Sequence, residues 1–124
     1  GGKDAGNVYA NTVSFTGTVD TVKPVISFVS DGPDPFQHHS GQTTTINYTL
    51  SENAYVRLRI YSGATLIRTL VNDVSKLSGP NNAIWDGKDN GNVLVPAGTY
   101  DYKIWAQDTA GNFTGPVTGT STAQ

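Results

Sequence analysis

The side chains best suited to acid–base catalysis near neutral pH are two adjacent histidines, His38 and His39, which stand beside Ser40. Neighbouring residues of an extended chain point in opposite directions, so we do not expect the two imidazoles to share one metal ion. A serine nucleophile needs a base and an orienting carboxylate, and no nucleophile-elbow pattern surrounds Ser40. We therefore expect a solvated loop here and a protein that is not an enzyme.

A second set of candidates lies in a loop rich in oxygen ligands, of the kind that calcium binds. The loop departs from the EF-hand pattern, because its oxygens do not occupy every second position and Lys88 stands among them. The candidate calcium ligands are Asp86, Asp89, Asn90 and Asn92.

Two aspartates near the linker, Asp31 and Asp34, form a further acidic pair that could bind calcium between modules. The alternative for the 86–92 loop is that its side chains stabilise turns, with Gly87 and Gly91 supplying positive φ angles. We expect this alternative to hold, with no required metal and no cofactor.

The third candidate is a contact surface. Residues 55–61 and 99–107 alternate apolar and polar side chains and would be neighbouring strands in an immunoglobulin-like sandwich. Their outward side chains include a tryptophan, which forgoes a burial free energy of about 2–3 kcal/mol. Trp, Tyr and Arg together are typical of contact surfaces. The predicted contact surface is Tyr55, Arg57, Arg59, Tyr61, Asp101, Lys103, Trp105 and Gln107.

Three explanations of this surface remain open at the level of sequence. The first is cover from within the same protein, either by Arg57 or Arg59 packing its stem over Trp105 as a cation–π pair, or by a neighbouring module or the N-terminal strand. A protein partner could bind the surface. The aromatic rings would also suit the stacking of sugar rings.

The composition excludes several classes of protein. The chain has 124 residues, with 8 Lys and Arg against 10 Asp and Glu and a formal charge of −2, which argues against a nucleic-acid partner. It has no cysteine, which excludes disulfide scaffolds and thiol chemistry. No apolar run approaches the roughly 20 residues of a membrane helix, so we expect no membrane insertion.

Short runs with period-two alternation, separated by Gly, Pro, Asn and Asp, indicate strands. We expect strands at 24–30, 44–50, 55–61, 65–71, 83–85, 99–107 and 113–120. In the first of these, Ile26 and Phe28 would share one face. The pattern predicts an all-β fold, an immunoglobulin- or fibronectin-III-like antiparallel β-sandwich of about seven strands. Its predicted core includes Ile46, Tyr48, Val56, Leu58, Ile60, Tyr100, Tyr102 and Ile104.

The segment 96–100 fits a tyrosine corner, in which the Tyr100 hydroxyl bonds to nearby backbone.

The N-terminal segment carries an internal echo. Residues 5–7 and 110–112 both read Ala-Gly-Asn, with an offset of 105 residues, about one immunoglobulin-like domain. We interpret residues 1–20 as the last strand and linker of a preceding module and residues 21–124 as one complete module; the alternative is a common turn sequence that occurs twice by chance. Val13, Phe15 and Val19 would form the apolar face of a strand that pairs within the chain or is donated to a neighbouring copy.

Two stretches, 34–61 and 67–102, resemble the FlgD-type Ig-like domain. The resemblance rests on Thr-Thr-Ile-Asn-Tyr-Thr-Leu at 44–50, Trp-Asp-Gly-Lys-Asp-Asn-Gly at 85–91 and Val-Pro-Ala-Gly-Thr-Tyr-Asp-Tyr at 95–102. That family includes the flagellar hook-capping protein and many modules of secreted enzymes and surface proteins.

The resemblance and the echo together imply a bacterial extracellular or cell-surface location. We expect a non-catalytic structural or adhesive module of a tandem-repeat protein or filament, whose partners are neighbouring modules or copies of itself. One alternative is an accessory module of a secreted hydrolase, a spacer or a binder of polysaccharide. The second alternative is an assembly module like the flagellar hook cap.

Overall fold

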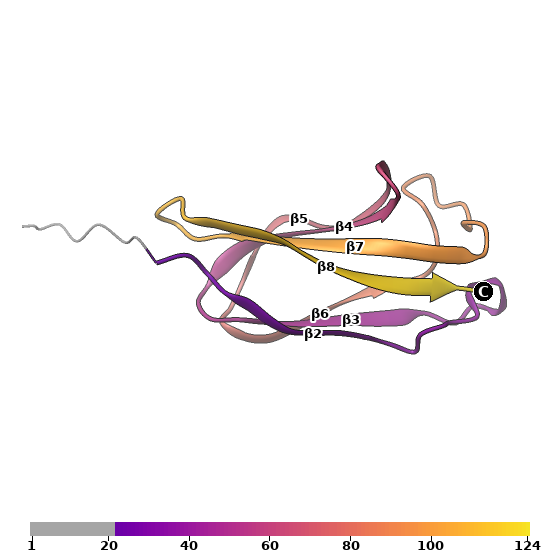
Figure 1. The fold of residues 1–124 in the computed structure, drawn as a ribbon, viewed down its shortest axis with the longest axis horizontal. Coiled ribbons are helices and arrows are strands. Elements are labelled where there is room, and N and C mark those ends of the chain that lie inside the picture. Colours follow the sequence, from indigo (N-terminus) through magenta and orange to yellow (C-terminus); the bar gives the residue numbers. More distant parts are fainter. Residues whose placement is uncertain (1–21) are drawn as a thin grey trace, which may run out of the picture.

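A computed structural model describes residues 22–124 as a two-layer antiparallel β-sandwich (Figure 1). One layer is a three-stranded sheet of order β2-β3-β6 and the other a four-stranded sheet of order β5-β4-β7-β8. Its elements are β2 (Ile26–Gly32), the 3-10 helix η1 (His38–Ser40), β3 (Thr44–Leu50), β4 (Ala54–Ser62), β5 (Thr65–Lys76), β6 (Gly79–Trp85), β7 (Gly98–Gln107) and β8 (Phe113–Ala123). The predicted fold class is confirmed.

The core lies between the two sheets and is built from the alternating strands. β4 and β7 pair in unbroken register from Tyr55 opposite Gln107 to Tyr61 opposite Asp101, so every second side chain of both strands faces the three-stranded sheet. All eight predicted core residues are buried, and Phe36 and Trp85 join them. The Tyr100 hydroxyl donates a hydrogen bond to the Pro96 carbonyl at 2.6 Å, which confirms the tyrosine corner.

The prediction for β2 is wrong at Phe28. Ser27 lies opposite Thr49 and Ser30 opposite Asn47, so two residues of β2 face a single residue of β3. This bulge lets Val29 pack against the core and turns Phe28 outward, with a φ of 51° and 84% of its surface exposed. Ile26 and Phe28 therefore do not share a face.

β5 and β6 are longer than their sequence patterns indicate. β5 continues past Val71 because Asp73, with a φ of 53°, forms a bulge between the pairs Arg57–Asn72 and Val56–Val74. β6 begins at Gly79 and contains Pro80, which a strand at the edge of a sheet tolerates.

The two ends of the sandwich, here called the N-terminal and C-terminal poles, are built from different segments. The N-terminal pole holds residues 22–25 and the turns at 51–53, 77–78 and 108–112, and the C-terminal pole holds η1, the turn at 63–64, the loop 86–97 and Gln124. The described chain enters at one pole and reaches its last residue at the other (Figure 1). Within residues 22–124 no helix is long and apolar enough to cross a membrane.

Candidate functional site

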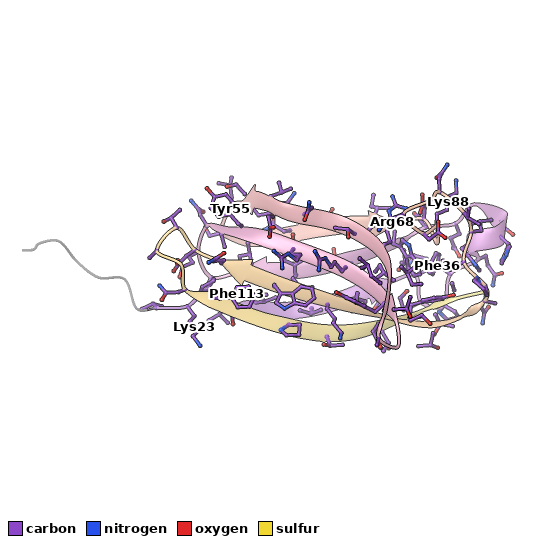
Figure 2. The ribbon with its side chains drawn as sticks, turned by 90° about the horizontal axis from the view of Figure 1, so that it is seen from above. Lys23, Phe36, Tyr55, Arg68, Lys88 and Phe113 are labelled. Atoms are coloured by element: carbon purple, nitrogen blue, oxygen red, sulfur yellow. The ribbon has the colours of Figure 1, made fainter. Side chains whose placement is uncertain are left out.

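The predicted contact surface forms the outer face of the four-stranded sheet. Arg57 lies directly opposite Trp105, and Arg59 opposite Lys103, across the β4–β7 ladder. Figure 2 looks onto this sheet, with Tyr55 of β4 and Phe113 of β8 toward the N-terminal pole and Arg68 of β5 toward the C-terminal pole. Strict alternation on two paired strands therefore brings all eight predicted residues to one face.

Trp105 is partly buried on this face. Its indole packs near Tyr61 with ring centroids 6.5 Å apart at an interplanar angle of 68°. On the other side Gly115 of β8, with a φ of 113°, leaves room for it, because a Cβ atom there would press against the Ile104 carbonyl and the Trp105 ring. Part of the cover that Trp105 requires thus comes from its own sheet.

Two cations of the face, Arg57 and Lys103, make contacts other than the cation–π pair with Trp105 that was one of the alternatives. Arg57 makes a two-point ion pair with Asp73, Nε to Oδ1 at 3.2 Å and Nη2 to Oδ2 at 2.9 Å. This carboxylate raises the pKa of the Arg57 guanidinium. Lys103 places its Nζ 4.8 Å from the centroid of the Tyr61 ring. The face therefore combines the partly buried rings of Tyr61 and Trp105 with the Arg57–Asp73 ion pair and the Lys103 ammonium group. Such a composition is suited to protein contacts.

The histidine pair does not form a solvated loop, which corrects the prediction for His38. His38 is only 1% exposed, with its Nδ1 2.8 Å from the Gln124 carbonyl oxygen and its Nε2 2.6 Å from the Val95 carbonyl oxygen. It packs beneath Gly87, where a Cβ atom would overlap the imidazole. His39 and Ser40 are exposed as predicted. His38 thus joins three segments of the C-terminal pole.

The oxygens of the 86–92 loop accept hydrogen bonds within the fold. Asp86 Oδ1 accepts from the backbone N–H of Lys88 and from Arg68, both at 3.0 Å, and Asp89 Oδ1 accepts from the N–H groups of Gly91 and Val93. Asn90 Oδ1 accepts from the Thr69 N–H. The bonds within the loop are those of the predicted turn-stabilising role, whereas the bonds from Arg68 and Thr69 join the loop to β5.

The glycine prediction in this loop is half right. Gly87 has a positive φ of 76°, whereas Gly91 does not, and Asn92 adopts the left-handed conformation with a φ of 64°. Across the described part of the chain, residues 22–124, no group of three or more His, Asp or Glu side chains could hold a metal ion.

Asp31 and Asp34 lie side by side at the end of β2, and both are engaged. The Tyr102 hydroxyl donates to Asp31 Oδ1 at 3.0 Å, and the Thr122 N–H donates to Asp34 Oδ1 at 2.9 Å. Burial, reinforced by Asp34, raises the pKa of Asp31 to about 6. Burial and the nearby Asp31 carboxylate also raise the pKa of Tyr102.

Sequence reasoning missed a pocket at the C-terminal pole. Its volume is about 410 Å³, and it opens between the β4–β5 turn and the loop that precedes β7. Apolar side chains dominate the lining, with one carboxylate beside them: Ile67, Val93, Leu94, Val95, Pro96 and Asp89. The signal available in the sequence was the run Val-Leu-Val-Pro at 93–96, which continues no strand.

A second group of exposed apolar side chains surrounds the N-terminal pole. This group consists of Val22, Val25, Tyr55, Val74, Leu77 and Phe113. The predicted donor-strand residues Val13, Phe15 and Val19, and the proposed boundary after residue 20, lie outside the described residues.

Comparison of the chain with protein-family models, with curated proteins and with solved structures finds no match. The resemblance to the FlgD-type Ig-like domain therefore stays a prediction.

Proposed function

We propose that this chain is a non-catalytic structural or adhesive module of a bacterial cell-surface or secreted multidomain protein or filament. It acts through contacts with neighbouring modules and with other proteins. The observation that carries the proposal is that the described residues, 22–124, enter the two-layer sandwich at one pole and reach residue 124 at the other (Figure 1). A module of this form extends a chain by its own length whenever another copy follows it.

The echo of residues 5–7 at 110–112 supports a tandem arrangement, since its offset matches one module. The exposed apolar side chains at both poles support contacts between successive modules, because contiguous exposed apolar groups mark interaction sites. The outer face of the four-stranded sheet gives each module a lateral surface as well.

Carbohydrate binding by the lateral face is the second candidate, and the pairing of Tyr61 with Trp105 favours it. A sugar ring stacks on a flat aromatic platform, however, and these two rings stand at 68° to each other. Gly115 of β8 also lies close to the indole, since a Cβ atom built there would be 3.1 Å from its Cδ1. The geometry suits edge contacts with protein side chains better than stacking along a glycan.

Calorimetric titration of the 124-residue chain with soluble polysaccharides separates the two candidates. We expect no saturable heat. Saturable binding that Trp105→Ala removes and that Tyr55→Ala, an aromatic change elsewhere on the same face, leaves intact would replace the structural proposal with the carbohydrate one.

A further inference from the structure

The pocket at the C-terminal pole lies next to the point where the described chain ends. His38 contacts Val95 in the pocket wall through one ring nitrogen and Gln124 through the other. The backbone N–H of Gln124 also donates to the Phe36 carbonyl at 2.9 Å, which holds the last residue in place. A chain that continues beyond Gln124 therefore starts at a residue that His38 joins to the backbone of the pocket wall.

The repeat offset sets how far a following module could lie from this pocket. With an offset of 105 residues, Gln124 would be followed by the equivalent of Asp20, and residues 20–25 would separate it from the next β2. Six extended residues span at most roughly 20 Å. The N-terminal pole of the following copy is thus confined close to the pocket.

Leu77 is the most exposed of the large apolar side chains described at that pole. It is 72% exposed at the turn between β5 and β6. The turn is held by two asparagine side chains: Asn53 Oδ1 accepts from the Ser78 N–H at 2.8 Å, and Asn81 Nδ2 donates to the Leu77 carbonyl at 2.9 Å. A large apolar side chain fixed in water by a rigid turn loses little conformational entropy when it binds.

Leu77 also lies near the point where the linker joins β2. Leu50 of β3 pairs with Ile26 on one side and with Gly79 on the other. Two strand spacings, about 10 Å, therefore separate Ile26 from Gly79, and Leu77 is two residues away. The linker is long enough to let Leu77 reach a pocket beside Gln124.

The charges beside the two partners are opposite. Lys76 precedes Leu77, and Asp89 lines the pocket. The Asp89 carboxylate accepts hydrogen bonds from the Gly91 and Val93 N–H groups through Oδ1, and Oδ2 is the oxygen to which an ammonium group would bind. Ion pairs of this kind fix register more than they add affinity.

We propose that the C-terminal-pole pocket is a docking site for a second copy of this module, with Leu77 of the following copy as the inserted side chain and Lys76 paired with Asp89. This inference rests on the proposed tandem function. The docking would make successive modules a stiff rod, since one apolar contact and one ion pair would hold each joint in a fixed orientation.

The test uses a fusion of residues 1–124 with residues 20–124 of a second copy, which preserves the offset of 105 and keeps all the described strands in both copies. NMR records the amide resonances of Thr65, Val93 and Leu94 of the first copy. We expect these resonances to move from their single-chain positions in the fusion and to return when the second copy carries Leu77→Ser. The matched variant Ile84→Ser, also an exposed aliphatic residue, should leave the fusion unchanged.

The ion pair is tested by combining Lys76→Gln in the second copy with Asp89→Asn in the first. The asparagine keeps the Oδ1 acceptor for the loop, so this loop should remain folded. Each single change should shift the pocket resonances part of the way back, and the double change should add little to either. Additive effects would show that Lys76 and Asp89 do not interact.

Pocket resonances that are identical in the fusion and the single chain, or that ignore Leu77→Ser, would overturn the docking proposal. If the fusion is nevertheless extended in small-angle scattering, the structural function stands and only the joint is wrong. A fusion whose copies pack side by side contradicts the function itself.

Discussion

The centre of the four-stranded sheet and the edge strand β2 follow the same alternating pattern in sequence and differ in structure. β4 and β7 keep one register over their whole pairing, and each has a hydrogen-bonded neighbour on both sides. Among the described strands β2 has one neighbour, β3, and its ladder shifts between Ser27 and Ser30. A shift of register in β4 or β7 would disrupt the hydrogen bonds to strands on both sides. The shift in β2 disrupts only part of its pairing with β3.

The difference shows where alternation determines the structure. In the central pair, the pattern fixes both the buried side, which forms the core, and the exposed side, which forms the candidate contact surface. At the edge, a single extra residue reverses the assignment, because side chains of a strand alternate with a period of two. Four variants test this comparison, from the largest expected effect to the smallest.

Ile104→Ala should have the largest effect. Ile104 is fully buried in β7 opposite Leu58, and its truncation leaves a cavity between the sheets. We expect a loss of about 2–5 kcal/mol in the free energy of unfolding, measured by urea denaturation. Phe28→Ala serves as the control and should change stability little. Equal losses from both variants would remove the distinction between centre and edge.

Gly119→Ala should lower the free energy of unfolding by about 1–3 kcal/mol, because the new Cβ atom would overlap the buried Tyr102 ring on the neighbouring strand. Tyr102 has little freedom to move, since its hydroxyl is bonded to Asp31. Gly98→Ala is the matched change in β7, where a Cβ atom meets only ordinary contacts. The melting temperature of the Gly98→Ala protein should not fall. A Gly119→Ala protein as stable as the unchanged chain would mean that the Tyr102 ring can move away from the new methyl group.

Phe28→Asn should stabilise the protein by about 0.5–1 kcal/mol, because asparagine tolerates the left-handed conformation that costs a bulky residue about 1–2 kcal/mol. Little burial is lost, given the exposure of Phe28. Thermal unfolding of the full chain measures the change. A destabilised variant would indicate that the Phe28 ring is covered, for instance by a partner copy.

Asp31 connects the edge strand to the centre and should make stability depend on pH. Its pKa is raised from 3.8 to about 6 in the folded protein, so the folded state binds the proton more tightly than the unfolded chain. The stabilising contribution is complete below pH 4 and is lost as the pH rises through about 6. Asp31→Asn should flatten this part of the profile and raise the melting temperature at pH 7; an unchanged slope between pH 4 and 6 would contradict the assignment.

Much of the fold follows from the sequence for physical reasons that particular residues illustrate. Tyr48, Leu58 and Ile104 alternate with polar neighbours in strands whose turns are marked by Gly, Asn and Asp. The extensions of β5 and β6 were not predictable, because Asn72-Asp73 has the composition of a turn and here forms a bulge.

The candidate contact surface could be predicted as a set of residues but not as an arrangement. Alternation places Arg57 and Trp105 on one face, yet their partners Asp73 and Gly115 come from the outer strands, whose register the sequence does not reveal. His38 resembled a solvated residue because its burial depends on Gly87, Val95 and Gln124, which are distant from it in sequence. The pocket was missed for the same reason, because the β4–β5 turn and the loop before β7 are distant in sequence and meet only in the folded protein.

Small-angle X-ray scattering on the fusion of residues 1–124 with residues 20–124 tests the central claim most directly, that the module extends a chain from one pole to the other. We expect a maximum dimension that exceeds that of the single chain by nearly one long axis of the sandwich, with a cross-section that stays the same. A maximum dimension close to that of the single chain, with a doubled cross-section, would contradict it.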